Sequence, residues 1–384
     1  MMRSIGILLP GSTLYPSIGI DFLQGIKSCF TFHQFSDIDI HVALIGYGIK
    51  EDDIHREAEK FLLIHNVDAV IAFAGDHLVN RLEPLFAAAG KLLLIANAGA
   101  NYPQLSTGGS HTIFHSLNDC ICTFLTGKLC AKESASKKAI MATSFYDGGY
   151  NHAHAMANAF IMEGGEIDFN FVSPLKKEDF NIGALEAFIK QHDPEVCNLI
   201  SIFSGDMARV FYEKIAPLQE AYNLHLYGSP MMFDSTAGDF PDAKPYVHQI
   251  KGFTGWLYEL DNEINNAFKR YYQNKNGKEA NIFSMQGWET ALILIAYLKQ
   301  RESVTSTLAA IEKLKELTLN SARGALRFNE HNLVTGPAYL VSAGNHLELT
   351  IEDTIEDISG AWKEMTLPKP DTGYSTWRNT YLCI

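Results

Sequence analysis

Residues 70–103 of the chain read VIAFAGDHLVNRLEPLFAAAGKLLLIANAGANYP, and this stretch decides the fold. A short apolar run from Val67 to Phe73 predicts a buried strand, which a turn at Gly75 and Asp76 ends. Helical spacing follows over residues 78–88, and residues 91–96 form a second apolar run. Two buried strands joined by a helix indicate a parallel pair, because parallel strands need a crossover and are covered on both faces.

The same alternation of strand and helix continues on both sides of this stretch. Before it, apolar runs or alternating residues predict strands over residues 5–9 and 38–46, with helices over 18–30 and 50–65. After it, the pattern starts again, with strands expected over residues 138–143, 166–172, 198–203 and 224–228. A chain of 384 residues is long enough for two domains. We therefore expect an α/β fold of two doubly wound lobes, each built on a parallel sheet.

Composition excludes several classes of function. Hydrophobic residues make up 47% of the chain and charged residues 20%, which is typical of a globular protein. The net charge of −13 disfavours binding to nucleic acid or to an anionic membrane surface, since phosphate contacts need clustered Lys and Arg. No apolar run is long enough for insertion across a membrane. The six cysteines are scattered, and we expect buried thiols rather than a disulfide framework.

The amino-terminal residues leave two locations open. Met1 to Ser4 lead directly into the apolar run at residues 5–9, with no preceding apolar segment and small-residue cleavage site. The expected location is therefore the cytoplasm, or a periplasmic or other extracytoplasmic compartment if a signal has been removed.

The common enzyme motifs are missing from the sequence. The turn after the first strand, PGSTLY at residues 10–15, has one glycine where a dinucleotide fold needs three. Neither a P-loop nor a G-x-S-x-G elbow occurs. His152 and His154 stand two residues apart on an expected helix, so they point to different sides and cannot share a metal ion. We expect no catalytic residues, no cofactor and no metal.

Ligands of open parallel sheets bind beyond the carboxyl ends of the strands, so the loops there hold the candidate residues. Asp76 and Asp206 each follow a predicted strand. Each suits a helix N-cap or a hydrogen-bond acceptor for a ligand, and one residue can serve both. An enzyme that used these two carboxylates would also need a nucleophile–base pair or a metal set, which the sequence does not supply.

Three segments carry a resemblance to a known family. They are the stretch 70–103, the helix FSMQGWETALIL at residues 283–294, and RGALRFN at residues 323–329. In this order they resemble type I periplasmic-binding proteins, and specifically the leucine/isoleucine/valine-binding branch of ABC transporter substrate-binding proteins. The likeness covers most of residues 4–345. It implies two discontinuous lobes joined by three crossovers, with residues 1–118 and 251–325 in the first lobe and 119–250 and 326–384 in the second.

The resemblance also implies where a ligand would lie. The family's carboxylate-binding serine falls at Asp76, its Ala-Ala-Thr turn at Asn97, Ala98 and Gly99, and its ammonium-binding acid at Pro230. Because Asp76, Gly99 and Pro230 each depart from the family pattern, most of the α-amino-acid recognition set is absent. A neutral or cationic ligand with a flat portion fits better than leucine. With the aromatic positions and strand-end residues added, the expected ligand-binding set is Tyr15, Asp76, Asn97, Ala98, Gly99, Tyr146, Tyr150, Phe203, Asp206, Met231 and Trp288.

Two functions remain open at this point. The first is capture of a small polar or aromatic solute by closure of the two lobes, followed by delivery to an ABC permease. The second is a cytoplasmic ligand sensor on the same fold, similar to the amide sensors, which regulates a partner protein. Both need a small-molecule ligand and neither needs catalysis.

Overall fold

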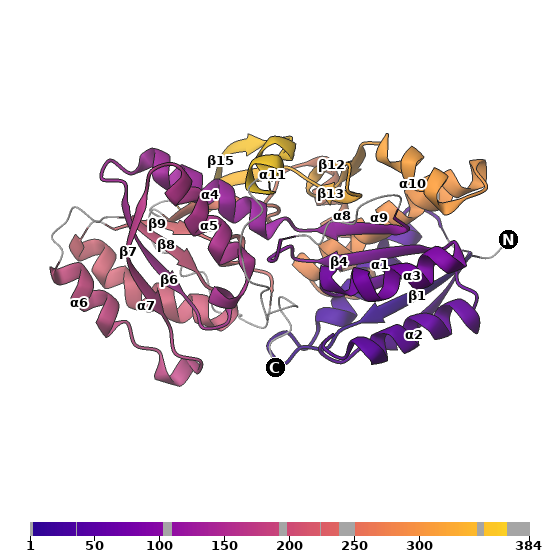
Figure 1. The fold of residues 1–384 in the computed structure, drawn as a ribbon, viewed down its shortest axis with the longest axis horizontal. Coiled ribbons are helices and arrows are strands. Elements are labelled where there is room, and N and C mark those ends of the chain that lie inside the picture. The colour runs from indigo at the N-terminus through magenta and orange to yellow at the C-terminus, as the bar shows by residue number, and fades with distance from the viewer. Residues whose placement is uncertain are drawn as a thin grey trace.

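The computed structural model describes residues 3–35, 37–102, 110–191, 198–222, 224–237, 250–343 and 349–366. It confirms the predicted α/β class, because two mainly parallel sheets each carry their own helices and form two lobes side by side (Figure 1). The cysteines at 197 and 383 lie outside the described residues, and Cys29, Cys120, Cys122 and Cys130 are buried free thiols. In the described part of the chain, no helix is both long enough and apolar enough to span a membrane.

One lobe is built on an eight-stranded sheet with the order β11-β12-β13-β5-β4-β3-β1-β2. Its five amino-terminal strands run parallel, and so does β13 beside β5, whereas β11 to β13 pair with one another antiparallel. The strands are β1 (Arg3–Leu9), β2 (Ile38–Leu44), β3 (Ala69–Phe73), β4 (Leu92–Asn97), β5 (Thr112–Ser116), β11 (Leu319–Ser321), β12 (Gly324–Phe328) and β13 (Leu333–Thr335). The helices are α1 (Ile18–Phe32), α2 (Glu51–Leu63), α3 (Val79–Ala89), α8 (Glu263–Asn276), α9 (Ile282–Ser303) and α10 (Thr307–Lys315).

The other lobe is built on a seven-stranded sheet with the order β15-β14-β10-β9-β8-β6-β7. Pairing is parallel from β7 to β10 and antiparallel at β14 and β15. The strands are β6 (Lys138–Thr143), β7 (Glu166–Val172), β8 (Asn198–Ile202), β9 (His225–Gly228), β10 (Ile250–Thr254), β14 (Ala338–Ala343) and β15 (Leu349–Ile355). The helices are α4 (Asp119–Glu133), α5 (Asn151–Met162), α6 (Gly183–Gln191), α7 (Gly205–Tyr222) and α11 (Ser359–Thr366).

The chain passes between the two sheets three times, after β5, after β10 and after β13. The first passage is at residues 117–118, between β5 and α4. The other two lie later in the chain than expected, because β10 pairs with β9 and β14, and the β12–β13 hairpin joins the eight-stranded sheet through β5. Residues 251–254 therefore belong to the seven-stranded sheet and not to the lobe expected for them. The hairpin within residues 326–335 belongs to the eight-stranded sheet, which also differs from the expected lobe. The division of the whole chain into lobes as folding units stays a prediction.

Helices α1 and α9 pack unusually closely, and two glycines make this contact possible. A Cβ atom built on Gly287 would overlap the backbone carbonyl of Phe22, and one built on Gly25 would overlap the carbonyl of Ser284. Asn281 caps α9 through the backbone N–H of Ser284, whose hydroxyl accepts the N–H of Asn281 in return. The start of α9 is thereby fixed against α1 and beside the loops that follow β1 and β4.

This contact predicts that Gly287→Ala destabilises the protein, by about 1–3 kcal/mol, because the two helix backbones must separate. Gly360→Ala is the matched control, since a Cβ there meets nothing within 4 Å and the residue lies in α11. Urea unfolding followed by circular dichroism measures both changes. Equal stability of the two variants would contradict the close helix contact.

Candidate functional site

Loops from the two lobes meet at the carboxyl ends of their strands. Tyr15 follows β1, and a Cβ atom on Gly205, at the start of α7 in the other lobe, would lie 2.8 Å from its hydroxyl oxygen. The backbone N–H of His152 donates to the carbonyl of Ala100 at 2.8 Å. The N–H of Ile282 donates to the hydroxyl of Thr236 at 2.9 Å. These contacts define the candidate site as the region between the two sets of loops.

On the eight-stranded lobe, the loops after β3 and β4 form one wall of the site, and the side chain of Asn97 links these loops. Its amide group donates to the carbonyl of Ala74 at 3.2 Å and to the carboxylate of Asp76 at 2.5 Å. Its oxygen accepts the backbone N–H of Gly99 at 2.8 Å. The amide of Gln286 on α9 donates to the backbone carbonyl of Asn97 at 2.5 Å. One asparagine therefore ties together the loops after β3 and β4 and the start of α9.

Gly99 is required at the turn of this wall. Its φ of +75° lies in the left-handed region that favours glycine, and a Cβ atom there would overlap the hydroxyl of Ser116. The turn continues by backbone bonds into the first passage between the lobes, where the N–H groups of Asp119 and Cys120 donate to the carbonyls of Ala98 and Gly99. A threonine side chain would not fit at this position.

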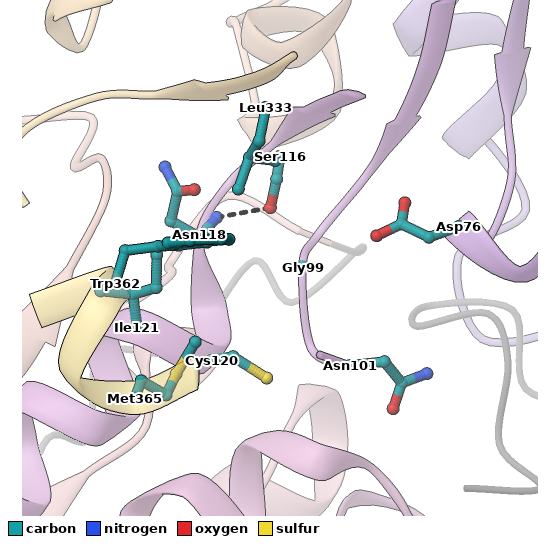
Figure 2. Close-up of a pocket in the computed structure, with 10 residues that line it drawn as sticks. All are labelled: Asp76, Gly99, Asn101, Ser116, Asn118, Cys120, Ile121, Leu333, Trp362 and Met365. Carbon is teal, nitrogen blue, oxygen red and sulfur yellow. Dashed lines mark hydrogen bonds between the residues drawn. The ribbon is translucent and has the colours of Figure 1, made fainter. Parts of the chain in front are cut away.

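Asp76 directs its carboxyl group toward the pocket between the lobes (Figure 2). Burial raises the pKa of this carboxyl to about 6, although the hydrogen bond from Asn97 favours the charged form. The pocket is lined by residues of both lobes, namely Asp76, Gly99, Asn101, Ser116, Asn118, Cys120, Ile121, Leu333, Trp362 and Met365.

On the seven-stranded lobe, the loops after β6 and β8 form the second wall of the site. Asp147 links these loops, as Asn97 links the loops of the first wall. The hydroxyl of Ser144, after β6, donates to one carboxylate oxygen at 2.5 Å. The hydroxyl of Ser204, after β8, donates to the other at 2.8 Å. Asp147 is 2% exposed, and burial raises the pKa of its carboxyl to about 6 against the effect of these bonds. The carboxylate thus joins the ends of two neighbouring strands.

Two further carboxylates, Asp119 and Asp234, lie in the same region. The pKa of Asp119 is raised to about 8, mainly by burial and also by the nearby charges of Asp234 and Asp147, although Arg323 acts to lower it. One oxygen of Asp234 accepts from the backbone N–H and the hydroxyl of Thr236 at 2.8 and 2.7 Å. The Oδ2 atoms of Asp119 and Asp234 find no hydrogen-bond partner among the described residues. The site therefore contains buried acceptors without donors.

Behind the site, a buried ion pair stands where the chain passes between the lobes. The Nε atom of Arg323 donates to Glu289 at 2.8 Å, and both side chains are fully buried. Glu289 also contacts His115 at 3.0 Å and accepts from the hydroxyl of Ser321 at 2.6 Å. Burial alone would raise the pKa of Glu289, but Arg323 and His115 lower it to about 2. Glu289 is therefore a permanent anion paired with a permanent cation.

All three passages between the lobes pack against Arg323. Its Nη2 atom donates to the carbonyl of Ser116, at the end of β5, at 3.0 Å. A Cβ atom on Gly255, just after β10, would lie 3.4 Å from its Nη1 atom. A Cβ atom on Gly336, between β13 and β14, would lie 3.4 Å from its Cζ atom. The Arg323 guanidinium is therefore the point at which the three hinge segments meet.

Some of the residues expected at the site lie at these walls or in the neighbouring loops, and others pack elsewhere. Asp76, Asn97, Ala98 and Gly99 lie together at the wall just described, and Tyr15 lies beside Gly205 with its ring 5.5 Å from that of Phe283. Tyr150 is buried with its ring 5.7 Å from His152, and Met231 is buried in the short helix after β9. The ring of Tyr146, which is half-buried, contacts Phe145 at 5.8 Å.

Trp288 and Phe203 pack on other aromatic rings, and Asp206 pairs with a lysine. The ring of Trp288 lies 5.1 Å from Phe268 and 5.2 Å from Phe32, because it is on the face of α9 that packs on α1 and α8. Gln286, two residues earlier, is on the face toward Asn97. Phe203 is fully buried and stacks on Phe211, with ring centroids 4.2 Å apart. Asp206 forms an ion pair of 3.7 Å with Lys177.

Sequence reasoning missed five residues of the region, namely Asp119, Asp147, Asp234, Phe283 and Gln286. The spacing of Ser144 and Asp147 was a usable signal, because a hydroxyl three residues before a carboxylate at a strand end typically forms a local hydrogen bond. Gln286 had no such signal, since only the packing of α9 shows which face it occupies.

Comparison with known proteins identifies the relatives of the chain. The profile of the family described as periplasmic binding protein matches residues 4–346. No curated protein sequence matches the chain. Among solved structures, a substrate-binding protein of an ABC transporter from Sphaerobacter thermophilus is 15% identical, with a TM-score of 0.76, over 92% of this chain and 98% of that one.

Two other solved structures contain ligands. A solute-binding protein from Rhodopseudomonas palustris in complex with 3,4-dihydroxybenzoic acid is 16% identical, with a TM-score of 0.70, over 92% of this chain and 97% of that one. A branched-chain amino acid transporter substrate-binding protein from Streptococcus pneumoniae, in complex with isoleucine, is 12% identical, with a TM-score of 0.66, over 93% of this chain and 100% of that one. At these identities the likeness shows a shared fold.

The hinge predicts a specific pattern of stability changes. Arg323→Met should destabilise the protein by about 3–5 kcal/mol, because it leaves the buried charge of Glu289 without its partner. The double variant Arg323→Met with Glu289→Leu should recover most of this loss, since neither buried charge remains. Urea unfolding measures the three free energies. Losses that simply add in the double variant would show that the two residues act independently.

The buried Asp119 predicts a dependence of stability on pH. The pKa of its carboxyl is about 8 in the fold and about 3.9 in an unfolded chain, so the folded protein holds a proton that the unfolded chain releases. This contribution is fully present below about pH 4 and is lost as pH rises through 8. Asp119→Asn should therefore gain stability relative to the wild type between pH 5 and pH 9. Melting temperatures of the two proteins that run parallel over this range would contradict the prediction.

Proposed function

The chain belongs to the periplasmic binding protein family, and from this we propose that it captures a small polar or aromatic solute between its lobes and presents it to an ABC permease. The observation that carries the proposal is the pair of pre-formed walls, held by Asn97 on one lobe and Asp147 on the other. Walls that are already ordered lose little conformational entropy when a ligand binds, which favours affinity.

The solved neighbours support a binding role and leave the ligand open. The Rhodopseudomonas palustris protein holds 3,4-dihydroxybenzoic acid and the Streptococcus pneumoniae protein holds isoleucine, so one fold accepts aromatic acids and aliphatic amino acids. The identity of the solute must therefore come from the side chains of this chain and not from its fold.

Binding would change the angle between the lobes at the three hinge segments. Each wall is built within one lobe, so closure changes the distance between the walls and leaves each wall intact. An extracytoplasmic location, where the protein meets its solute before the permease does, is part of the proposal. Catalysis is not part of it.

Native mass spectrometry tests the proposal. The wild-type protein, incubated with an extract of its native cells and desalted, should carry a small molecule that unfolding releases. Asn97→Leu should lower the occupancy at least about tenfold, equivalent to about 1.4 kcal/mol, because the wall loses its side-chain bonds. Cells that lack the gene should lose uptake of the same molecule.

The matched control is Asn276→Leu, because this asparagine bonds Ser28 between α8 and α1, in the helix layer. It should bind the solute like the wild type. Absence of any bound molecule from native extracts, together with unchanged uptake in the deleted cells, would contradict the proposed function.

A further inference from the structure

Four carboxylates lie in the loops that meet between the lobes. Asp76 belongs to one lobe, and Asp119, Asp147 and Asp234 to the other. Within the described ranges, none of the four forms an ion pair with Lys or Arg. Arg323 is near enough to Asp119 to lower its pKa, but its Nε atom is held by Glu289. Uncompensated negative charge at this density is costly unless a positive charge binds or the groups are protonated.

Gln286 gives an independent indication of what binds there. This side chain is fully buried, and its amide group is held by the carbonyl of Asn97, which fixes its orientation at the wall. Its Oε1 atom finds no hydrogen-bond donor in the described part of the chain. The Oδ2 atom of Asp119, a residue 3% exposed, also has no hydrogen-bond donor among the described residues. Leaving a buried acceptor without a donor is costly, so these two acceptors favour a ligand that brings N–H or O–H donors.

We propose that the solute is an organic cation with several N–H donors, such as a primary amine or a diamine. Its N–H donors bond the acceptors that lack a partner, namely the Oδ2 atoms of Asp119 and Asp234 and the Oε1 atom of Gln286. The carboxylate of Asp147 adds negative charge beside Asp119. This inference rests on the proposed function, since it names the chemical class of the captured solute. Charge-assisted hydrogen bonds from an ammonium group to carboxylates are about twice as strong as neutral ones.

The geometry favours an organic cation over a metal ion. Among the residues that the structure describes, no group of three His, Cys, Asp or Glu side chains is placed to hold a metal. The carboxylates are spread over loops of both lobes, and Asn97, Ser144 and Ser204 already bond two of them. A ligand with donors at separated positions satisfies such an arrangement. A simple anion would meet repulsion from each charged carboxylate.

The raised pKa values of the four carboxylates agree with this assignment, because burial disfavours the charged form of each carboxyl and a bound cation would favour it. An entering ammonium group stabilises the charged carboxylates.

Isothermal titration calorimetry of the full chain tests the inference with 1,4-diaminobutane, benzylamine and agmatine, against isoleucine, benzoate and calcium chloride. At least one amine should bind, with affinity at least about tenfold above that of every other probe. Asp119→Asn and Asp147→Asn should each weaken this binding at least about tenfold. Asp168→Asn is the control, since it removes the same charge from β7, where Asp168 pairs with Lys138 of β6. Circular dichroism confirms that each variant is folded.

Several results would overturn the inference. If isoleucine or benzoate binds and no amine does, the cationic class is wrong while the proposed function stands. If calcium chloride gives the same heat as the amines, the carboxylates hold a metal. If an amine binds equally well to Asp119→Asn and Asp147→Asn, it binds elsewhere. If none of the probes binds, the amine assignment fails, and the mass spectrum of the native solute decides separately whether the protein is a binding protein.

Discussion

The buried ion pair between Arg323 and Glu289 constrains the geometry of the whole molecule. Both side chains are fully buried, so their charges are tolerated only in an arrangement that pairs them. His115 and Ser321 complete the set around Glu289, and the carbonyl of Ser116 accepts from Arg323. Such a pair contributes more to the choice of one arrangement than to net stability, because desolvation offsets much of the attraction.

The position of this pair explains how two lobes made from interrupted segments act together. Segments at 116, 255 and 336 all pack on one guanidinium group, so the hinge has a single buried centre. Each lobe then presents a wall that is organised internally, through Asn97 on one side and Asp147 on the other. Rigid walls on a common hinge are what closure around a solute needs, since binding then changes one angle and few side-chain conformations.

Much of the fold could be predicted from the sequence because it depends on local patterns. Apolar runs such as residues 69–73 and 92–96 become buried central strands, and turns with glycine or proline separate them from helices. The β12–β13 hairpin was misplaced because its partner, β5, lies more than 200 residues earlier and no local pattern records that pairing.

At the site, Asp76, Asn97 and Gly99 were predictable from their place after strands. Trp288 was not, because an aromatic residue on an apolar helix does not show which face it occupies. Asp119, Asp147 and Asp234 resemble ordinary cap and turn residues until the fold brings them together.

A crystal structure of the protein with the solute that it binds from its native cells would test the central claim most directly. The account predicts electron density for one small molecule between the loop at Asn97 and the loop at Asp147, with the Arg323–Glu289 pair intact in the hinge. Density for the solute on an outer face of either lobe, with the region between Asn97 and Asp147 filled only by solvent, would contradict it.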